Sequence, residues 1–135
     1  MTMSIVGGCY CGAVRYEAKS APLGSMVCHC QSCRRIAGAP VVAWFTVAQE
    51  SLQLRGPTSA FESSAGVRRS FCTACGTPIT YQNAKSPEEI DVTTCTLDDP
   101  NALPPTHHSW LSHDLRWVRF GDELPTYSES RYGSG

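Results

Sequence analysis

The chain has 135 residues, of which 41% are hydrophobic and 17% are charged, and its formal net charge is −1. This length predicts a single domain, residues 1–135, and this composition predicts a folded chain with one core. A net charge so close to zero argues against a general binder of nucleic acids or membrane surfaces.

The first segment, MTMSIVGGCYCG, has no basic start followed by a long apolar stretch, so it does not predict a signal peptide. The longest apolar run, APVVAWF, is too short to cross a bilayer. We therefore expect a cytoplasmic protein in a reducing compartment.

Short β-strands are predicted along most of the chain. Residues 13–18 alternate apolar and polar side chains, which is typical of a half-buried strand. Residues 41–47, VVAWFTV, are β-branched and aromatic, which predicts a strand buried on both faces. Residues 59–63 and 67–71 flank a turn at 64–66 and predict a hairpin. The other predicted strands are 25–30, 52–56, 78–82 and 89–97.

Helical signals are scarce. The best candidate is SCRRIAG, in which Ser32 would cap the helix, Cys33 would open it and Gly38 would end it. The C-terminal tail is rich in proline and turns, with strand-like pieces around 107–111 and 116–120. Together these patterns predict a mainly β domain of short antiparallel strands with little helix.

The chain contains eight cysteines, most of them closely spaced. In a reducing compartment such cysteines bind metal or act in redox chemistry more often than they form disulfides. They form C-x-C at Cys9 and Cys11, C-x-C-x-x-C at Cys28, Cys30 and Cys33, and C-x-x-C at Cys72 and Cys75, and Cys95 stands alone.

The two cysteine pairs together predict a closed metal site. Sulfurs in a tetrahedral zinc site lie within about 4 Å of one another, because each zinc–sulfur bond is about 2.3 Å long. A C-x-C pair on one face of a strand brings its sulfurs together, and so does a tight C-x-x-C turn, which Gly76 permits. The four thiolates would come from Cys9, Cys11, Cys72 and Cys75. The alternative is a redox dithiol at the C-x-x-C pair, although the βαβ surroundings of thioredoxin-like motifs are lacking.

The remaining three cysteines predict a different kind of site, because three protein ligands and one open position is the layout of a catalytic zinc. Cys33 is predicted at a helix N-terminus, where the helix dipole favours a thiolate. Arg34 and Arg35 could offset negative charge there, although such a pair is more typical of a solvated face. The alternative is a second structural site, completed by His29, Cys95 or a histidine of the tail.

Four segments are distinctive, namely GGCYCGAVRYEA, CHCQSCRRIAGAP, FCTACGTPI and HSWLSHDLRWVRFGDELPTY. Their order resembles the glutathione-dependent formaldehyde-activating enzyme family, which includes centromere-protein-V-like proteins. The resemblance covers nearly the whole chain and implies a β-tent fold, whose short antiparallel strands are held together by zinc. It also implies two Zn²⁺ per chain, a structural one on Cys9, Cys11, Cys72 and Cys75 and a catalytic one on Cys28, Cys30 and Cys33. Cys95 matches no ligand of the family, and we expect a buried free thiol there.

The resemblance implies a carbon–sulfur lyase similar to S-(hydroxymethyl)glutathione synthase, which joins the thiol of glutathione to formaldehyde. A zinc with one open position can bind a thiol and deprotonate it. The site then holds the thiolate and the aldehyde together, which lowers the entropic cost of their encounter. The expected partners are a small-molecule thiol and an aldehyde, with no nucleic acid and no membrane.

The other groups of the expected site are less well defined by sequence. His29 and His108 are candidates for the acid that protonates the developing alkoxide, although a lone histidine is more often structural. Trp44, Phe45 and Trp110 are candidates for a pocket wall, although aromatic side chains more often belong to the core.

Two other functions stay open at this stage. A non-enzymatic interaction module would use both metal sites only to hold its fold. A redox enzyme would instead use Cys28 and Cys33 as a dithiol and release zinc on oxidation.

Overall fold

A computed structural model describes residues 4–132 of the chain. The strands in that range are β1 (Ile5–Gly8), β2 (Arg15–Ala18), β3 (Gly24–Cys28), β4 (Val42–Ala48), β5 (Leu52–Arg55), β6 (Thr58–Ser64), β7 (Val67–Cys72), β8 (Pro78–Asn83), β9 (Glu89–Thr93) and β10 (His108–Ser109). The helices are α1 (Gln31–Ala37) and the short 3₁₀ segments η1 (Gln49–Ser51), η2 (Thr94–Thr96), η3 (Pro100–Ala102) and η4 (Leu111–His113). The predicted mainly β fold with little helix is confirmed. No helix within residues 4–132 has the length and apolarity needed to cross a bilayer.

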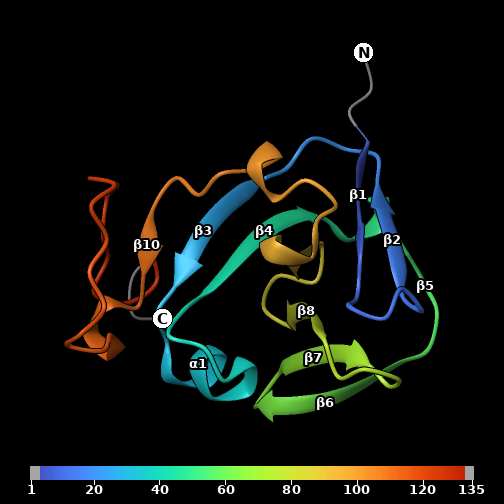
Figure 1. Cartoon of the computed structure of the whole chain (residues 1–135), viewed down its shortest axis with the longest axis horizontal. Coiled ribbons are helices and arrows are strands. Elements are labelled where there is room, and N and C mark those ends of the chain that lie inside the picture. Colours follow the sequence, from blue (N-terminus) through green and yellow to red (C-terminus); the bar gives the residue numbers. More distant parts are fainter. Residues whose placement is uncertain (1–3, 133–135) are drawn as a thin grey trace.

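The strands form two sheets. The smaller one has three strands in the order β1-β2-β5, and the larger one has seven in the order β10-β3-β4-β9-β8-β7-β6. Neighbours are antiparallel, except that β10 pairs in parallel with β3. Figure 1 shows the small sheet upright at one end of the larger sheet, which continues from β3 and β4 down to the β6–β7 hairpin. In this order β4 pairs with β9, and β3 pairs with β10, so strands that are far apart in the sequence are neighbours in the larger sheet.

Strand β4 gives the larger sheet two different faces. Successive side chains of a strand point to opposite sides, so Phe45 and Val47 face one way and Trp44 faces the other. Phe45 and Val47 are 0% exposed and belong to the main core. Trp44 packs instead with Cys28 and Cys33 in a smaller cluster. The predicted burial of this strand on both faces is therefore confirmed, and we call the side that carries Trp44 the site face.

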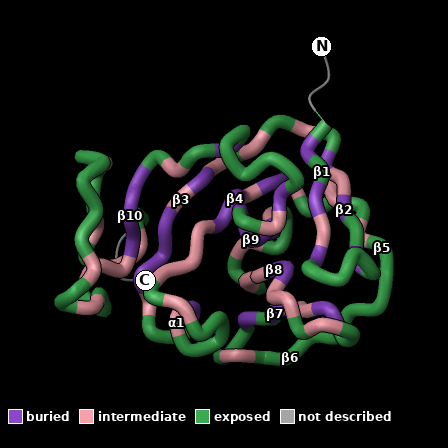
Figure 2. Tube along the Cα trace, in the orientation of Figure 1, coloured by how far each residue is buried: buried purple, intermediate pink, exposed green. Residues whose placement is uncertain are grey.

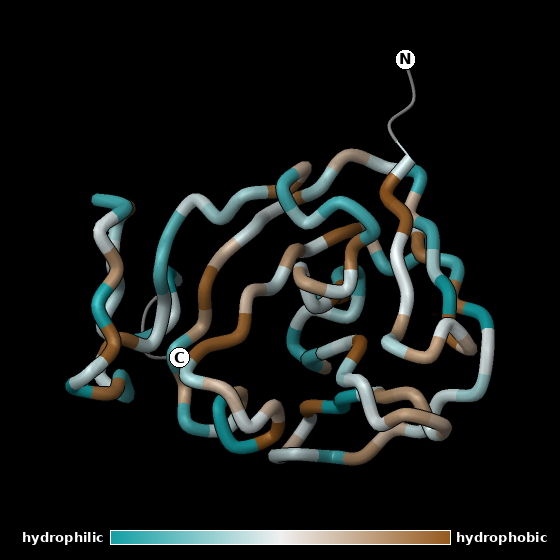
Figure 3. Tube along the Cα trace, in the orientation of Figure 1, coloured by the Kyte–Doolittle hydropathy of each residue, from teal (hydrophilic) through white to brown (hydrophobic). Residues whose placement is uncertain are grey.

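The burial pattern of the chain follows this arrangement. Figure 2 shows buried positions along β1, β2, β3, β4 and β10, and Figure 3 shows hydrophobic stretches on β1, β3 and β4. The small sheet contributes Ile5, Tyr16 and Ala18 to the main core, where they pack with Phe45. The core therefore lies between the two sheets and leaves the site face free for other chemistry.

Strand β1 forms although no pattern in the sequence predicted it. A Cβ atom at Gly7 would lie 2.3 Å from the Tyr16 hydroxyl and 2.5 Å from the backbone oxygen of Thr96, so this position needs glycine. The Tyr16 hydroxyl also forms a 2.7 Å hydrogen bond with the Thr96 hydroxyl. Gly7 therefore allows a close approach between β1 and its neighbours that a side chain would prevent.

The predicted hairpin at 59–71 is confirmed, with Gly66 in its turn at a φ of 77°. The predicted strand over 89–97 ends earlier, at Thr93, and η2 follows. The Thr96 hydroxyl donates to the Thr93 carbonyl at 2.7 Å, and such local bonds favour a turn over an extended strand.

The tail contains less strand than predicted. Of residues 107–111, only β10 is extended in a sheet, and residues 116–120 form no strand. The Val118 amide donates to the Leu115 carbonyl at 3.1 Å, so this segment is folded into a turn. Trp117 and Val118 belong to this turn, whereas Phe120 follows it and packs on the rings of His29 and His108.

Helix α1 starts earlier than predicted. Its N-cap is Cys30, whose Sγ accepts a hydrogen bond from the Cys33 amide at 3.2 Å, so the expected cap at Ser32 is wrong. The predicted end at Gly38 is confirmed, with φ at 62° and its amide bonded to the Arg34 carbonyl at 2.8 Å. Cys30 therefore caps the helix that contains Cys33, another cysteine of the same motif.

The core makes a first prediction. Replacing Phe45 with alanine should lower the free energy of unfolding by about 3–5 kcal/mol, because it empties a fully buried position between the sheets. Replacing Phe61, which is 39% exposed on β6, should cost clearly less. Urea unfolding of both variants measures the difference, and equal losses would contradict this location of the core.

Candidate metal centres

The first cluster of sulfurs consists of Cys9, Cys11, Cys72 and Cys75, which we call the four-cysteine cluster. Their sulfurs all lie within 4.8 Å of one another. The Cys9 and Cys11 sulfurs are 3.6 Å apart, and those of Cys11 and Cys72 are 3.9 Å apart. These separations match the edges of a tetrahedral zinc–thiolate site, so the cluster could hold a metal ion.

Two tight turns bring these sulfurs together. Cys9 and Cys11 lie in the turn after β1, where the Gly12 amide bonds to the Cys9 carbonyl at 3.2 Å and Gly12 has a φ of 83°. This corrects the expectation that the pair shares one face of a strand. The second turn follows β7, and there Gly76 has a φ of 83° and its amide bonds to the Cys72 carbonyl at 2.8 Å. The role predicted for Gly76 is therefore confirmed.

Two of the four sulfurs, those of Cys9 and Cys75, accept hydrogen bonds that favour the thiolate form, whereas the pKa of Cys11 is raised. The Val14 amide donates to the Cys9 sulfur at 3.2 Å, and the Thr77 hydroxyl lies 3.1 Å from the Cys75 sulfur. Hydrogen bonds from the Thr77 side chain and backbone lower the pKa of Cys75 to about 5. A thiolate is the form that binds metal, so the donor set fits a closed site with four sulfur ligands.

The second cluster, the three-cysteine cluster, consists of Cys28, Cys30 and Cys33, whose sulfurs lie within 4.8 Å of one another. Cys28 ends β3, Cys30 caps α1 and Cys33 lies in its first turn. In the described part of the chain no fourth histidine, cysteine, aspartate or glutamate joins this group. The alternative in which His29, Cys95 or a tail histidine completes the set therefore gains no support.

The three cysteines differ in the direction in which their pKa values are shifted. Hydrogen bonds from the thiols of Cys28 and Cys33 lower the pKa of Cys30 well below its usual range. The same bonds raise the pKa of Cys28, which is 4% exposed. These hydrogen bonds thus favour the thiolate form at Cys30, the half-buried sulfur of the trio, and a bound cation would favour it at the other two.

A cavity of about 520 Å³ opens beside the three-cysteine cluster on the site face of the sheet. Residues of neighbouring strands lie side by side in its wall. Met26 of β3 pairs with Trp44 of β4, and Asp91 of β9 pairs with Tyr81 of β8. The cavity also contains charged groups that include Lys85. Its volume lies in the range of small-molecule sites.

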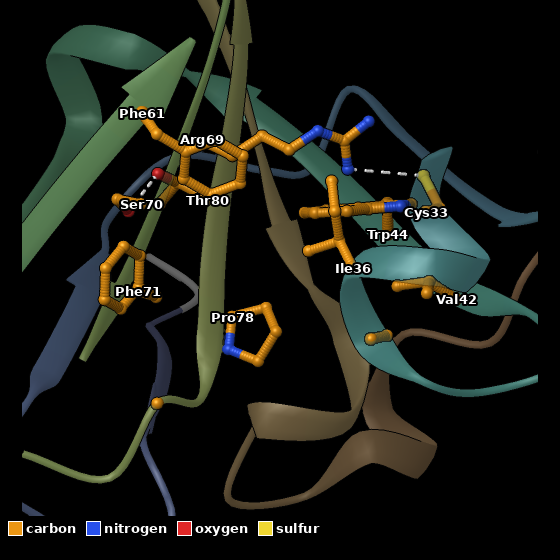
Figure 4. A pocket seen from close by; sticks show the side chains of 12 residues that line it. Cys33, Ile36, Val42, Trp44, Phe61, Arg69, Ser70, Phe71, Pro78 and Thr80 are labelled. Carbon is orange, nitrogen blue, oxygen red and sulfur yellow. Dashed lines mark hydrogen bonds between the residues drawn. The ribbon is translucent and has the colours of Figure 1, made fainter. Parts of the chain in front are cut away.

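A smaller cavity of about 270 Å³ touches the same cluster (Figure 4). It lies between α1 and strands β6–β8, and most of its wall is apolar, with Ile36, Phe61 and Phe71 among the residues that form it. Cys33, Trp44 and Arg69 border both cavities, so the two spaces adjoin at one sulfur, one indole ring and one cation.

The histidines suggested as acids do not line either cavity. His29 Nε2 lies 2.9 Å from His108 Nδ1, and His108 Nε2 lies 2.8 Å from an Asp122 oxygen. Both histidines are 2% exposed, and Phe120 packs on their rings. They form a buried chain that ties β3 to the tail.

The aromatic candidates divide between the two roles. Trp44 and Trp110 line the larger cavity, whereas Phe45 is in the main core. Cys95, expected as a buried thiol, is exposed instead. Cys95 lies in η2, which directly follows β9. Its side chain is therefore outside the strand, where alternation of buried and exposed positions would have buried it.

Sequence reasoning missed two cavity residues, Arg69 and Asp91. Arg69 is 6% exposed, and its Nη1 lies 3.5 Å from the Cys33 sulfur. Asp91 accepts a 2.5 Å hydrogen bond from the Thr46 hydroxyl, and burial raises the pKa of its carboxyl group to about 6. Strand alternation places Arg69 on the same face as Val67, but the sequence carries no signal that this face, or the face of Asp91, lines a cavity.

The sequence profile of the glutathione-dependent formaldehyde-activating enzyme family matches residues 4–113, which include both cysteine clusters. The chain belongs to this family. The resemblance seen in the cysteine segments is thereby confirmed, and the two clusters are features of a member of that family.

Relatives in this family carry related names. An uncharacterized lyase of Schizosaccharomyces pombe is 30% identical over 87 residues, which cover 63% of this chain and 64% of the yeast protein. A protein of Halomonas elongata that bears the family's name is 27% identical over 126 residues, covering 86% of this chain and 80% of that protein. The fold also matches the crystal structure of a Rhodobacter sphaeroides protein, with a TM-score of 0.58, 22% identity, and coverage of 90% and 98% of the two chains.

The four-cysteine cluster yields a second prediction. Replacing Cys72 with serine should remove one metal equivalent and destabilise the fold by several kcal/mol, because binding energy at a closed site is folding energy. Metal analysis and thermal unfolding measure both effects. The matched control is Cys95→Ser, which changes an exposed cysteine outside both clusters and should leave metal content intact. Full metal content in the Cys72 variant would contradict the assignment.

The buried carboxyl group of Asp91 yields a third prediction. Its folded-state pKa of about 6 lies above the ordinary value, so the native state binds the extra proton and stability falls as pH rises from 4 through 6. Asp91→Asn removes this loss, which amounts to at most about 3 kcal/mol at about 1.36 kcal/mol per pKa unit. Urea unfolding of both proteins at pH 4 and pH 7 should show the variant gaining relative to wild type. A constant difference would contradict the prediction.

Proposed function

We propose that this protein is a zinc-dependent carbon–sulfur lyase that joins a small thiol, such as glutathione, to an aldehyde, such as formaldehyde. The observation that carries the proposal is the three-cysteine cluster at a cavity wall, with three sulfurs in place and no fourth ligand within residues 4–132. Membership of the formaldehyde-activating family supports the same reaction class.

In this proposal Cys28, Cys30 and Cys33 hold the catalytic zinc. A zinc ion held by these residues would have an open position for the substrate sulfur and would lower the pKa of that thiol. The thiolate sulfur then forms a bond to the aldehyde carbon, the carbonyl electron pair moves to oxygen, and that oxygen takes up the proton that the thiol lost. The reverse reaction breaks the same carbon–sulfur bond, so no oxidant or reductant is needed.

The larger cavity suits a polar thiol. Its charged and titratable groups include Lys85, Asp91, His107 and Arg131, beside the apolar wall formed by Trp44. Glutathione carries carboxylates and an ammonium group, and such groups need opposite charges or hydrogen bonds in a cavity. The mixture of both signs around one reactive cluster favours a zwitterionic peptide thiol over a simple hydrocarbon thiol.

The four-cysteine cluster has a structural part in this proposal. Its sulfurs come from two turns, and its four ligands leave no position for a substrate. A zinc ion there would link the turn after β1 to the turn after β7 and support the core between the sheets.

The experiment that tests the function uses Cys30→Ser. Serine retains an oxygen that can cap α1, so the fold should persist while one zinc equivalent and the activity are lost. The purified, metal-analysed wild-type protein is assayed with glutathione, cysteine and 2-mercaptoethanol against formaldehyde and larger aldehydes, relative to the uncatalysed condensation. Wild type should accelerate at least one pair, and Cys30→Ser should fall to the uncatalysed rate.

Three results would count against this function. If no pair is accelerated by metal-loaded wild type, the non-enzymatic module becomes the better reading of the two clusters. If Cys30→Ser and Cys72→Ser lose metal, stability and activity alike, the division into an open and a closed site is wrong. Reversible oxidation of the cluster with release of zinc would instead favour the redox alternative.

A further inference from the structure

Arg69 is an unusual side chain for the inside of this domain. It is 6% exposed, whereas the adjacent Arg68 on the same strand points outward and is exposed. Its guanidinium lies 5.0 Å from the ring centre of Tyr81 and 5.9 Å from that of Trp44. Figure 4 shows the side chain extending from β7 across the cavity toward Cys33. Its position is therefore fixed by packing on two aromatic rings.

No carboxylate in residues 4–132 forms an ion pair with this buried cation. In residues 4–132 the ion pairs join Arg15 to Asp98 and His108 to Asp122, and none of them includes Arg69. Asp91 borders the same cavity and feels the charge of Arg69, which opposes the rise in the pKa of its carboxyl group, but its side-chain hydrogen bond is to Thr46. A buried charge is costly unless it is paired, so the group in direct contact with the guanidinium matters most.

That group is the three-cysteine cluster. Arg69 Nη1 lies 3.5 Å from the Cys33 sulfur, and its Nε donates to the Ser63 hydroxyl at 2.9 Å. The Nη2 group has no hydrogen-bond partner among the described residues. A guanidinium presents its donors in a rigid fork, so Nη2 stays available to a second acceptor beside the one at Cys33.

The charges decide what that acceptor is. Three thiolates and one Zn²⁺ sum to −1, and Arg69 brings the resting centre to zero. A neutral fourth ligand leaves this balance unchanged, whereas a thiolate adds one negative charge. Without Arg69 the same thiolate would bring the buried centre to −2, which a cavity of low dielectric strongly disfavours.

We propose that Arg69 forms an anion-binding subsite at the three-cysteine cluster, which selects an anionic sulfur as the fourth ligand of the bound metal. The proposal rests on the proposed function only in taking that sulfur to be the thiolate of the substrate. Arg69 acts through the charge and direction of its guanidinium, which pairs with the Cys33 thiolate and offers its free donors to the incoming anion.

The test uses protein loaded with Co²⁺, whose absorption spectrum changes when a ligand enters an open coordination position. The closed four-cysteine cluster has no such position, so the spectral change isolates the three-cysteine cluster. Wild type, Arg69→Met, Arg69→Lys and the matched control Arg68→Met are each titrated with 2-mercaptoethanol, an anionic ligand once bound, and with imidazole, a neutral one.

Arg69→Met should bind 2-mercaptoethanol about tenfold or more weakly than wild type, as expected for a lost hydrogen bond to a charged group, and should bind imidazole unchanged. Arg69→Lys retains the charge but not the fork, so its affinity for the thiol should lie between the two. Arg68→Met should behave like wild type with both ligands. A merely structural role of Arg69 would weaken both ligands together, and that result would overturn the proposal.

Folding is checked for each variant by circular dichroism before titration. If Arg69→Met does not fold, Arg69→Lys decides, because thiol affinity equal to wild type would overturn the subsite and a selective loss for the thiol would support it. A wild-type protein that takes no thiol at all would also overturn it. A wild type that binds the thiol but accelerates no condensation with an aldehyde refutes the proposed function and leaves the subsite supported.

Discussion

The convergence of sulfurs from two distant turns is the constraint on which the rest of this structure depends. Cys11 and Cys72 are 61 positions apart, yet their sulfurs are 3.9 Å from each other. The first turn belongs to the small sheet and the second to the larger sheet, so a metal ion held by the four-cysteine cluster would link the two sheets. Closing so long a loop costs chain entropy, which metal binding can offset in a domain with so little helix.

The two faces of the larger sheet have different roles: one packs in the main core, and the other carries the three-cysteine cluster and its cavity. On β4, Phe45 and Val47 point into the core between the sheets, and Trp44 points to the site face. Because the side-chain period of a strand is two, one strand serves both purposes without any insertion. Helix α1 is short and connects the end of β3 to the start of β4. Its N-cap, Cys30, therefore lies close to Cys28 at the end of β3 and belongs to the three-cysteine cluster.

Electrostatics on the site face follow from this separation. The three-cysteine cluster gathers negative charge in a partly buried place, and Arg69 is held beside it by Tyr81 and Trp44. In the proposed site, a metal ion and this fixed cation would together balance three thiolates, so one further anion could be bound there. The proposed carbon–sulfur chemistry requires this property, because the sulfur nucleophile must be bound as an anion.

Spacing in the sequence by itself determined the grouping of the cysteines, the central buried strand and the hairpin around Gly66, because these depend on local geometry and side-chain period. Tertiary structure alone decided the pairing of β1, where Gly7 is needed by a neighbouring strand, and the turn that exposes Cys95. It also decided the inward direction of Arg69 and Asp91. Alternation shows which residues share a face of a strand, but only the packing of two sheets decides which face is buried.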